Sequence, residues 1–194
     1  MAAQINNPEI VRCKWCGTDP LYTKYHDEEW GKEVHDDRIL FEFLILESAQ
    51  AGLSWITILK RRENYRAAFE EFDPLKVAAF SEEDVERLMQ DSGIIRNRMK
   101  IESAVNNARQ FLAIKEEFGS FDSYLYSFMP EGKPIINDII DYKQAPARTV
   151  ISDAIAKDMK KRGFKFFGST ICYAYMQATG MVNDHITDCH FRKQ

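Results

Sequence analysis

The sequence is poor in cysteine, with four among 194 residues. Four cysteines in a chain of this length do not make a disulfide framework, so we expect a reducing compartment, the cytoplasm. A membrane-spanning stretch is also lacking, because even the apolar run LFEFLILE is interrupted by Glu42 and Glu47. The opening residues 1–12, MAAQINNPEIVR, lack a basic start followed by an apolar segment, so the sequence predicts neither a signal peptide nor a membrane partner.

Excess positive charge is absent as well, since the net charge is −4 and the isoelectric point is about 5.6. That balance argues against a general nucleic-acid-binding protein. Basic residues nevertheless gather locally, within 60–62, 96–100 and 157–165. For any one of these groups, a solvated helix face is the simpler interpretation.

Strand-type alternation is almost absent, and most of the chain follows a helical period. The stretch 37–51 is apolar nearly all round, as expected of a central buried helix. Prolines and glycines make 129–150 a loop. We therefore expect one all-α domain over residues 1–194, with further helices at 54–69 capped by Ser54, at 82–90 opened by Ser81 and Asp84, at 97–115, at 121–128, at 152–162 capped by Ser152, and at 169–179.

Two pairs of candidate metal ligands stand near the two ends of the chain: Cys13 with His26, and His185 with Cys189. The second pair has an H-x3-C spacing, one helical turn, so both side chains can face one point. Two thiolates and two imidazoles suit a tetrahedral Zn²⁺. Such an ion would join the two ends of the chain as a structural clasp.

Other interpretations of this pattern remain open. Cys16 forms a C-x2-C with Cys13, which is a better-known zinc half-site, and His190 is a second substitute ligand. Without a metal, each cysteine would be a small buried apolar side chain, and each histidine an ordinary core or surface residue.

The segment DSGIIRNR, residues 91–98, joins two predicted helices and has the shape of the hairpin in a helix-hairpin-helix, placed at about 82–111. In that motif, backbone N–H groups and a helix N-terminus face a DNA phosphate. Plain packing of two helices explains the same pattern. The residues that would form the turn, fill it or reach phosphates are Gly93, Ile94, Arg96, Arg98 and Lys100.

Glu47 is difficult to explain as a surface residue. It follows Leu40 by seven residues, with Phe43 and Leu44 between, which places a carboxylate on the apolar face of the most apolar helix. Burying a carboxylate without partners is costly, so Glu47 needs hydrogen-bond donors, a cationic partner or a proton. Either it belongs to a functional site or it makes a structural hydrogen bond to a loop backbone.

Aromatic residues crowd the same part of the sequence, and all three tryptophans lie in the first 55 residues. Such a cluster is usually just core. Together with one buried carboxylate, it also describes a pocket that stacks a flat heterocycle and reads its edge, and a flipped nucleobase is such a ligand. The cluster consists of Trp15, Tyr22, Tyr25, Trp30 and Trp55.

Long segments of the chain resemble the bacterial DNA-3-methyladenine glycosylase I family. The resemblance covers nearly the whole chain, apart from residues 1–10 and the loop 129–150. It is carried by RCKW (12–15), DPLYTKYHDEEWG (19–31), LESAQAGLSWITILKRRENYRAAF (46–69), DSGIIRNRMKI (91–101), KKRGFKFFGSTICYAYMQATGMVNDH (160–185) and Cys189.

The resemblance implies the helix-hairpin-helix DNA glycosylase fold and the excision of 3-methyladenine from alkylated double-stranded DNA. Cleavage of the N-glycosidic bond releases the base as a product. The family lacks the aspartate that most of its superfamily uses at the sugar, so we name no such residue. Methylation at N3 makes the base cationic, so it departs as a neutral base and needs extrusion and stacking more than acid catalysis.

The resemblance also assigns residues. Four match the zinc ligands, Glu47 matches the carboxylate that contacts the base, and five aromatics surround the base, while Cys16 departs from the family pattern. We add Leu53, in the turn AGLSW, as the wedge that fills the vacated stack, and we expect a monomer. The alternative is a non-catalytic, zinc-stapled DNA-binding module. The matched ligands are Cys13, His26, His185 and Cys189, and the aromatics are Tyr25, Trp55, Trp15, Trp30 and Tyr22.

Overall fold

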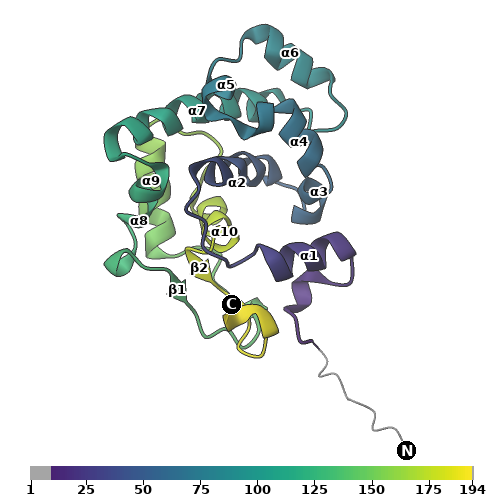
Figure 1. Ribbon diagram of the computed structural model, residues 1–194, viewed down its shortest axis with the longest axis vertical. Helices are drawn as coiled ribbons and strands as arrows, with labels where there is room; N and C mark the ends of the chain where they lie inside the picture. The colour runs from purple at the N-terminus through teal and green to yellow at the C-terminus, as the bar shows by residue number, and fades with distance from the viewer. Residues whose placement is uncertain (1–9, 194) are drawn as a thin grey trace, which may run out of the picture.

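Helices make up most of the computed structural model, which describes residues 10–193 (Figure 1). The α-helices are α1 (Pro20–Glu28), α2 (Asp37–Gln50), α3 (Trp55–Leu59), α4 (Arg62–Ala68), α5 (Pro74–Ala78), α6 (Glu82–Gln90), α7 (Arg98–Phe118), α8 (Phe121–Tyr126), α9 (Val150–Lys161) and α10 (Ser169–Ala178). Single 3-10 turns lie at Lys14–Cys16, Glu70–Phe72, Pro130–Gly132, Tyr142–Gln144 and His190–Lys193, and two short strands are β1 (Ile135–Ile136) and β2 (Val182–Asn183). The helical class expected from the sequence is confirmed.

Helix α2 lies at the centre of the fold, with α7 on one side and α10 on the other (Figure 1). Every residue from Leu40 to Ala49 is buried, as the apolar pattern of this stretch predicts. The helix begins at Asp36, whose carboxylate accepts hydrogen bonds from the N–H groups of Arg38 and Ile39. This placement puts the last turn of α2, which contains Glu47, inside the protein.

Several predicted helix ends need correction. The single helix expected over 54–69 is two helices, α3 and α4, and the Ser54 hydroxyl pairs with the Thr57 hydroxyl at 2.7 Å instead of capping the backbone. Helix α9 begins earlier than expected, because Thr149 is its N-cap and Ser152 is the reciprocal partner in a capping box. The capping box predicted for α6, between Ser81 and Asp84, is confirmed.

Helices α1 and α5 were not predicted, and both begin with an Asp-Pro pair. Asp19 and Asp73 each cap the following backbone N–H groups, and Pro20 and Pro74 occupy the first helical positions. Proline at that position loses no hydrogen bond, because the first N–H groups of a helix have no partner within it. Asp73-Pro74 therefore starts a helix, whereas the helix before it, α4, already ends at Ala68.

The loop predicted at 129–150 is irregular, but it contains β1, which pairs in parallel with β2. Ile135 stands opposite Val182, and a further bridge joins Ile139 to Ile186. Strands of two residues are too short to show alternation in the sequence, so this pairing could not be predicted from it. It fastens the loop to the C-terminal segment.

The linker between α1 and α2 runs against the end of α10. The N–H groups of Gly31 and Val34 donate to the carbonyls of Gln177 and Thr179 at 2.9 and 3.0 Å. Gly180 has a positive φ of +71°, and a Cβ there would lie 2.1 Å from the Lys32 carbonyl carbon, so only glycine fits this approach. As a result α1 and the C-terminal segment are neighbours, at the end of the molecule opposite α6 (Figure 1).

Within residues 10–193, the structure contains no helix long and apolar enough to cross a membrane.

Candidate functional site

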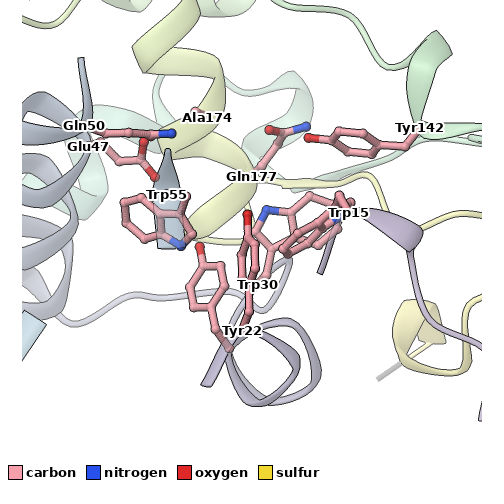
Figure 2. A pocket seen from close by; sticks show the side chains of 10 residues that line it. Trp15, Tyr22, Trp30, Glu47, Gln50, Trp55, Tyr142, Ala174 and Gln177 are labelled. Carbon is pink, nitrogen blue, oxygen red and sulfur yellow. The ribbon is translucent and has the colours of Figure 1, made fainter. Parts of the chain in front are cut away.

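A cavity of about 180 Å³ opens between α1, α2, α3 and α10 (Figure 2). The structure brings together here all six residues that the sequence suggested for a heterocycle pocket. Four lining residues were not predicted: Gln50, Tyr142, Ala174 and Gln177. The predicted ones are Trp15, Tyr22, Tyr25, Trp30, Glu47 and Trp55.

Aromatic rings form most of the cavity wall, in two groups. The Trp15 ring centroid lies 5.1 Å from that of Tyr22 and 4.8 Å from that of Trp30, both at steep angles. On the other side, Tyr25 lies 5.4 Å from Trp55. The indole N–H groups of Trp15 and Trp55 are buried and have no hydrogen-bond partner among the described groups. The wall therefore offers apolar ring faces and two unpaired donors, which suits a flat ligand with polar edges.

Glu47 is 3% exposed, and its Oε2 atom has no hydrogen-bond partner among the described residues. Burial, which removes the water that would stabilise the charge, raises its pKa from 4.5 to about 8. Of the three ways to tolerate this carboxyl that the sequence left open, the structure favours the proton. Burial thus favours the neutral, protonated form of this carboxyl, which faces the cavity.

The unpredicted lining residues differ in how far the sequence could have revealed them. Gln50 follows Glu47 by three residues, so the helical repeat alone places it on the same face of α2. Ala174 and Gln177 share the same spacing on α10, but neither residue type draws attention in an apolar helix. Tyr142 lies in the irregular loop, where no periodicity orients a side chain.

The four candidate metal ligands converge on one point, and all are buried. Cys189 Sγ lies 3.3 Å from His185 Nδ1 and 3.6 Å from His26 Nε2, and Cys13 Sγ lies 3.6 Å from His185 Nδ1. A tetrahedral ion bound at about 2.0–2.3 Å would separate its ligand atoms by roughly 3.3–3.8 Å. The donor set therefore has the size and chemistry of a metal site.

The groups around this cluster also fit a metal. His26 Nδ1 lies 2.7 Å from Asp27 Oδ1, and His185 Nε2 lies 2.9 Å from the Trp30 carbonyl, so each ring directs its other nitrogen to the centre. Arg12 holds Asp27 through contacts of 2.7–2.9 Å. These partners orient the imidazoles.

Neither substitute ligand belongs to the cluster. The Cys16 thiol points away and donates to the Cys13 carbonyl at 3.1 Å. His190 is exposed and lies outside the group of converging ligands.

The predicted hairpin joins α6 to α7 and packs on α4. Gly93 has a negative φ, and a Cβ there would lie 2.9 Å from Asn64 Cβ, so glycine permits the close approach of this turn to α4. Ile94 is buried, and Tyr65 accepts a hydrogen bond from the Ile95 N–H at 3.1 Å. The turn is thus held by side chains of the neighbouring helix.

Among the described residues, Arg96 is the one hairpin cation whose side chain has neither an ion pair nor a hydrogen bond. Arg96 is exposed and makes no ion pair there, whereas Arg98 pairs with Glu82, Glu86 and Glu102. Exposed pairs of this kind are weak, about 0–1 kcal/mol each, so Arg98 can exchange them for a stronger anion at small cost.

Lys100 is placed differently. Its ammonium donates to the Ala49 and Ala51 carbonyls at 2.9 and 2.7 Å, at the C-terminus of α2. There it stabilises the negative end of the helix dipole. These contacts tie the hairpin helix to the turn that contains Leu53. Leu53 is 40% exposed and lines a second cavity that shares Glu47, Gln50 and Ala174 with the first.

The raised pKa of Glu47 predicts how stability depends on pH. Between about pH 4.5 and 8 the unfolded chain releases this proton while the folded protein keeps it, so rising pH favours unfolding. Glu47→Gln has no carboxyl at this position, so it escapes this loss of stability at higher pH. Its stability relative to the parent should therefore increase from pH 5 to pH 8.5, by on the order of a few kcal/mol, in urea unfolding curves.

The control is Glu83→Gln, which changes an exposed glutamate on α6. Its difference from the parent should stay nearly constant over the same range. Parallel curves for Glu47→Gln and the parent would show that the carboxyl is solvated or paired in solution.

Comparison with known proteins places the chain among named relatives. It is 53% identical over 180 residues to DNA-3-methyladenine glycosylase 1 of Escherichia coli K12, covering 93% of this chain and 96% of the relative. It is 49% identical over 179 residues to the DNA-3-methyladenine glycosylase of Haemophilus influenzae, with 92% and 96% coverage.

Solved structures of such enzymes share the fold. A crystal structure of 3-methyladenine DNA glycosylase I superimposes with a TM-score of 0.90 at 55% identity, covering 93% of this chain and 98% of that one. A tyrosine-to-phenylalanine variant of another, in complex with 3-methyladenine, gives 0.91 at 37% identity, with 94% and 98% coverage. Residues 15–193 match the methyladenine glycosylase family, and the chain belongs to it.

Proposed function

We propose that this protein is a DNA-3-methyladenine glycosylase, which excises 3-methyladenine from alkylated DNA by hydrolysing the N-glycosidic bond. The observation that carries the proposal is Glu47, a buried carboxyl without a protein partner, in a cavity walled by aromatic rings. Relatives at about half identity bear the name of this activity, and one related structure holds 3-methyladenine.

The reaction needs little acid catalysis from the protein. N3-methylation leaves a positive charge on the base, so when the bond between N9 and the sugar breaks, its electron pair neutralises the departing base. Water then adds to the sugar and releases a proton. The protein has to extrude the base, stack it and hold its edge.

The pocket residues divide this work. Trp15, Tyr22, Tyr25, Trp30 and Trp55 stack against the base and exclude water from it, as aromatic walls do in sites for flipped bases. Glu47 accepts a hydrogen bond from the base edge. Contact with a cationic base favours the charged carboxylate, so binding lowers the pKa that burial had raised.

The hairpin is the proposed docking element for double-stranded DNA. Gly93 and Ile94 shape the turn, Arg96 offers its free charge, and Arg98 exchanges its surface ion pairs for phosphate. Lys100 contributes chiefly by holding the end of α2 in place.

Leu53 is the proposed wedge, because it is exposed and lines the second cavity, which shares Glu47 with the aromatic one. We further propose that residues 1–194 act as one domain, in the cytoplasm and as a monomer. The helices on both sides of α2 belong to one continuous apolar core, which supports the single domain.

The buried cluster is the proposed site of a structural zinc ion, held by Cys13, His26, His185 and Cys189. Two thiolates with two imidazoles at tetrahedral spacing favour Zn²⁺, and four protein ligands leave no position for a substrate. When bound, the ion supplies a crosslink between the first and last segments of the fold. It has no part in the cleavage step.

The alternative is a zinc-stapled DNA-binding module without catalysis. Such a module needs the hairpin but has no use for a base pocket. The aromatic cavity with its unpaired carboxyl therefore favours the enzyme.

Incubation with methylated DNA, followed by chromatography of the released bases, tests the proposal. The parent protein should release 3-methyladenine. Glu47→Gln keeps the size of the side chain but adds two donors, so it should release the base at least tenfold more slowly. Release by Glu47→Gln at the parent rate, with circular dichroism and metal content unchanged, would show that the carboxyl is structural. DNA binding without any release by the parent would favour the module.

The zinc proposal predicts about one Zn²⁺ per chain in elemental analysis. Cys189→Ala should lose the metal and much of the stability, because binding of a structural ion contributes directly to folding. Cys16→Ser serves as the control and should keep the metal. A stable metal-free preparation, or metal loss in Cys16→Ser alone, would contradict this site.

The hairpin proposal predicts that Arg96→Glu weakens DNA binding and flattens its dependence on salt, because one phosphate contact and its counterion release are lost. Lys133→Glu makes the same change of charge beside the 3-10 turn Pro130–Gly132, away from the hairpin, and should bind nearly as the parent does. Fluorescence anisotropy with duplex DNA at several salt concentrations measures both. Equal weakening by the two variants would mean that only the total charge matters.

A further inference from the structure

Asp184 is fully buried and is surrounded by side-chain donors. Its Oδ1 accepts a hydrogen bond from Asn137 at 2.7 Å, and its Oδ2 accepts one from Tyr173 and one from Gln177, each at 2.7 Å. Asn137, Tyr173 and Gln177 thus donate to both oxygens of this buried side chain. The carboxylate therefore determines how its neighbours are turned.

Gln177 is the neighbour that faces the pocket. It extends from α10 into the cavity that also receives Glu47 from α2, and it is 6% exposed. The Gln177 amide presents its nitrogen to Asp184, because the hydrogen bond between them runs from Nε2 to Oδ2 at 2.7 Å. Tyr142 lines the same cavity beside this amide (Figure 2).

The amide oxygen is thus left for the cavity. Figure 2 shows the nitrogen of Gln177 on the side of Tyr142 and its oxygen on the side of Glu47. A side-chain amide in solution can offer either a donor or an acceptor. Here the hydrogen bond to Asp184 holds the nitrogen away from the cavity, so Gln177 presents its oxygen, an acceptor, to a ligand.

We propose that Gln177 determines base specificity: its amide oxygen, oriented by Asp184, accepts a hydrogen bond from the exocyclic amino group at C6 of the bound base. This inference rests on the proposed function. The amino group has two hydrogens, and the pocket offers two acceptors on different helices, Glu47 on α2 and Gln177 on α10. Adenine-type bases are thereby selected over bases with a carbonyl at C6.

The selection depends on whether the group at C6 can donate a hydrogen bond to the Gln177 oxygen. An amino group donates to the Gln177 oxygen. A carbonyl oxygen at the same position would face that oxygen with neither having a proton to share, so both would be buried without the hydrogen bonds they make in water. A site built to pair with a donor rejects a close analogue that lacks it.

Free-base binding tests the inference, with tryptophan fluorescence as the signal. The probes are 3-methyladenine and 3-methylhypoxanthine, which differ in the group at C6. The parent should prefer 3-methyladenine by roughly tenfold or more, and Gln177→Met, similar in length but without a strong acceptor, should lose most of that preference.

Tyr173→Phe is the matched control. It removes a different donor from the same oxygen of Asp184, and Tyr173 does not line the cavity. If Gln177 acted only by satisfying Asp184, both variants would change base preference equally, and that result would overturn the inference. Gln177→Asn is the second variant if Gln177→Met does not fold, because it keeps an amide but withdraws the oxygen.

The parent is assayed in parallel for release of 3-methyladenine from methylated DNA. Release together with an unchanged preference in the Gln177 variants overturns this inference alone. Absence of release overturns the proposed function, and the free-base comparison still decides whether Gln177 reads the C6 group. A parent that binds both bases equally overturns the inference.

Discussion

The candidate site depends on one constraint, the burial of an ionisable side chain in the wall of a cavity. Glu47 lies in the last turn of the most buried helix, and no described side chain offers it a charge or a donor. The rest of the apolar core has to stabilise the protein enough to tolerate this position. A carboxyl that destabilises the free protein but meets a partner in a bound ligand is the arrangement expected of a binding site.

The proposed metal site and the pocket support each other through shared residues. The Trp30 carbonyl accepts from His185 Nε2, while the Trp30 ring lines the pocket. Asp184 precedes His185 in the chain and orients Gln177. Closing the chain between its ends therefore also fixes two pocket walls. Loss of the proposed ion would then loosen the aromatic wall before it affects the hairpin, which lies at the opposite end (Figure 1).

The site residues that could be predicted from the sequence are those of a type that is unusual for their position. A carboxylate among apolar residues and three tryptophans near one end stand out in any sequence, and cysteine and histidine spacing indicated the four converging ligands. Family resemblance strengthened these assignments.

The remaining pocket residues are of ordinary types, and three-dimensional packing alone gives them a role. Gln177 became informative only with its partner Asp184, and Tyr142 only through the short strand pair that fastens its loop. Lys100 shows the opposite case, because its basic character suggested phosphate while its ammonium lies on two backbone carbonyls.

The most direct test of this account is the titration of the Glu47 carboxyl by carbon NMR, with Glu47→Gln to assign the signal. In the free protein the midpoint should lie near pH 8, as expected from burial without a partner, and addition of 3-methyladenine should lower it as donors reach the carboxylate. A midpoint near the ordinary value of 4.5 in the free protein, unmoved by the base, would contradict the account.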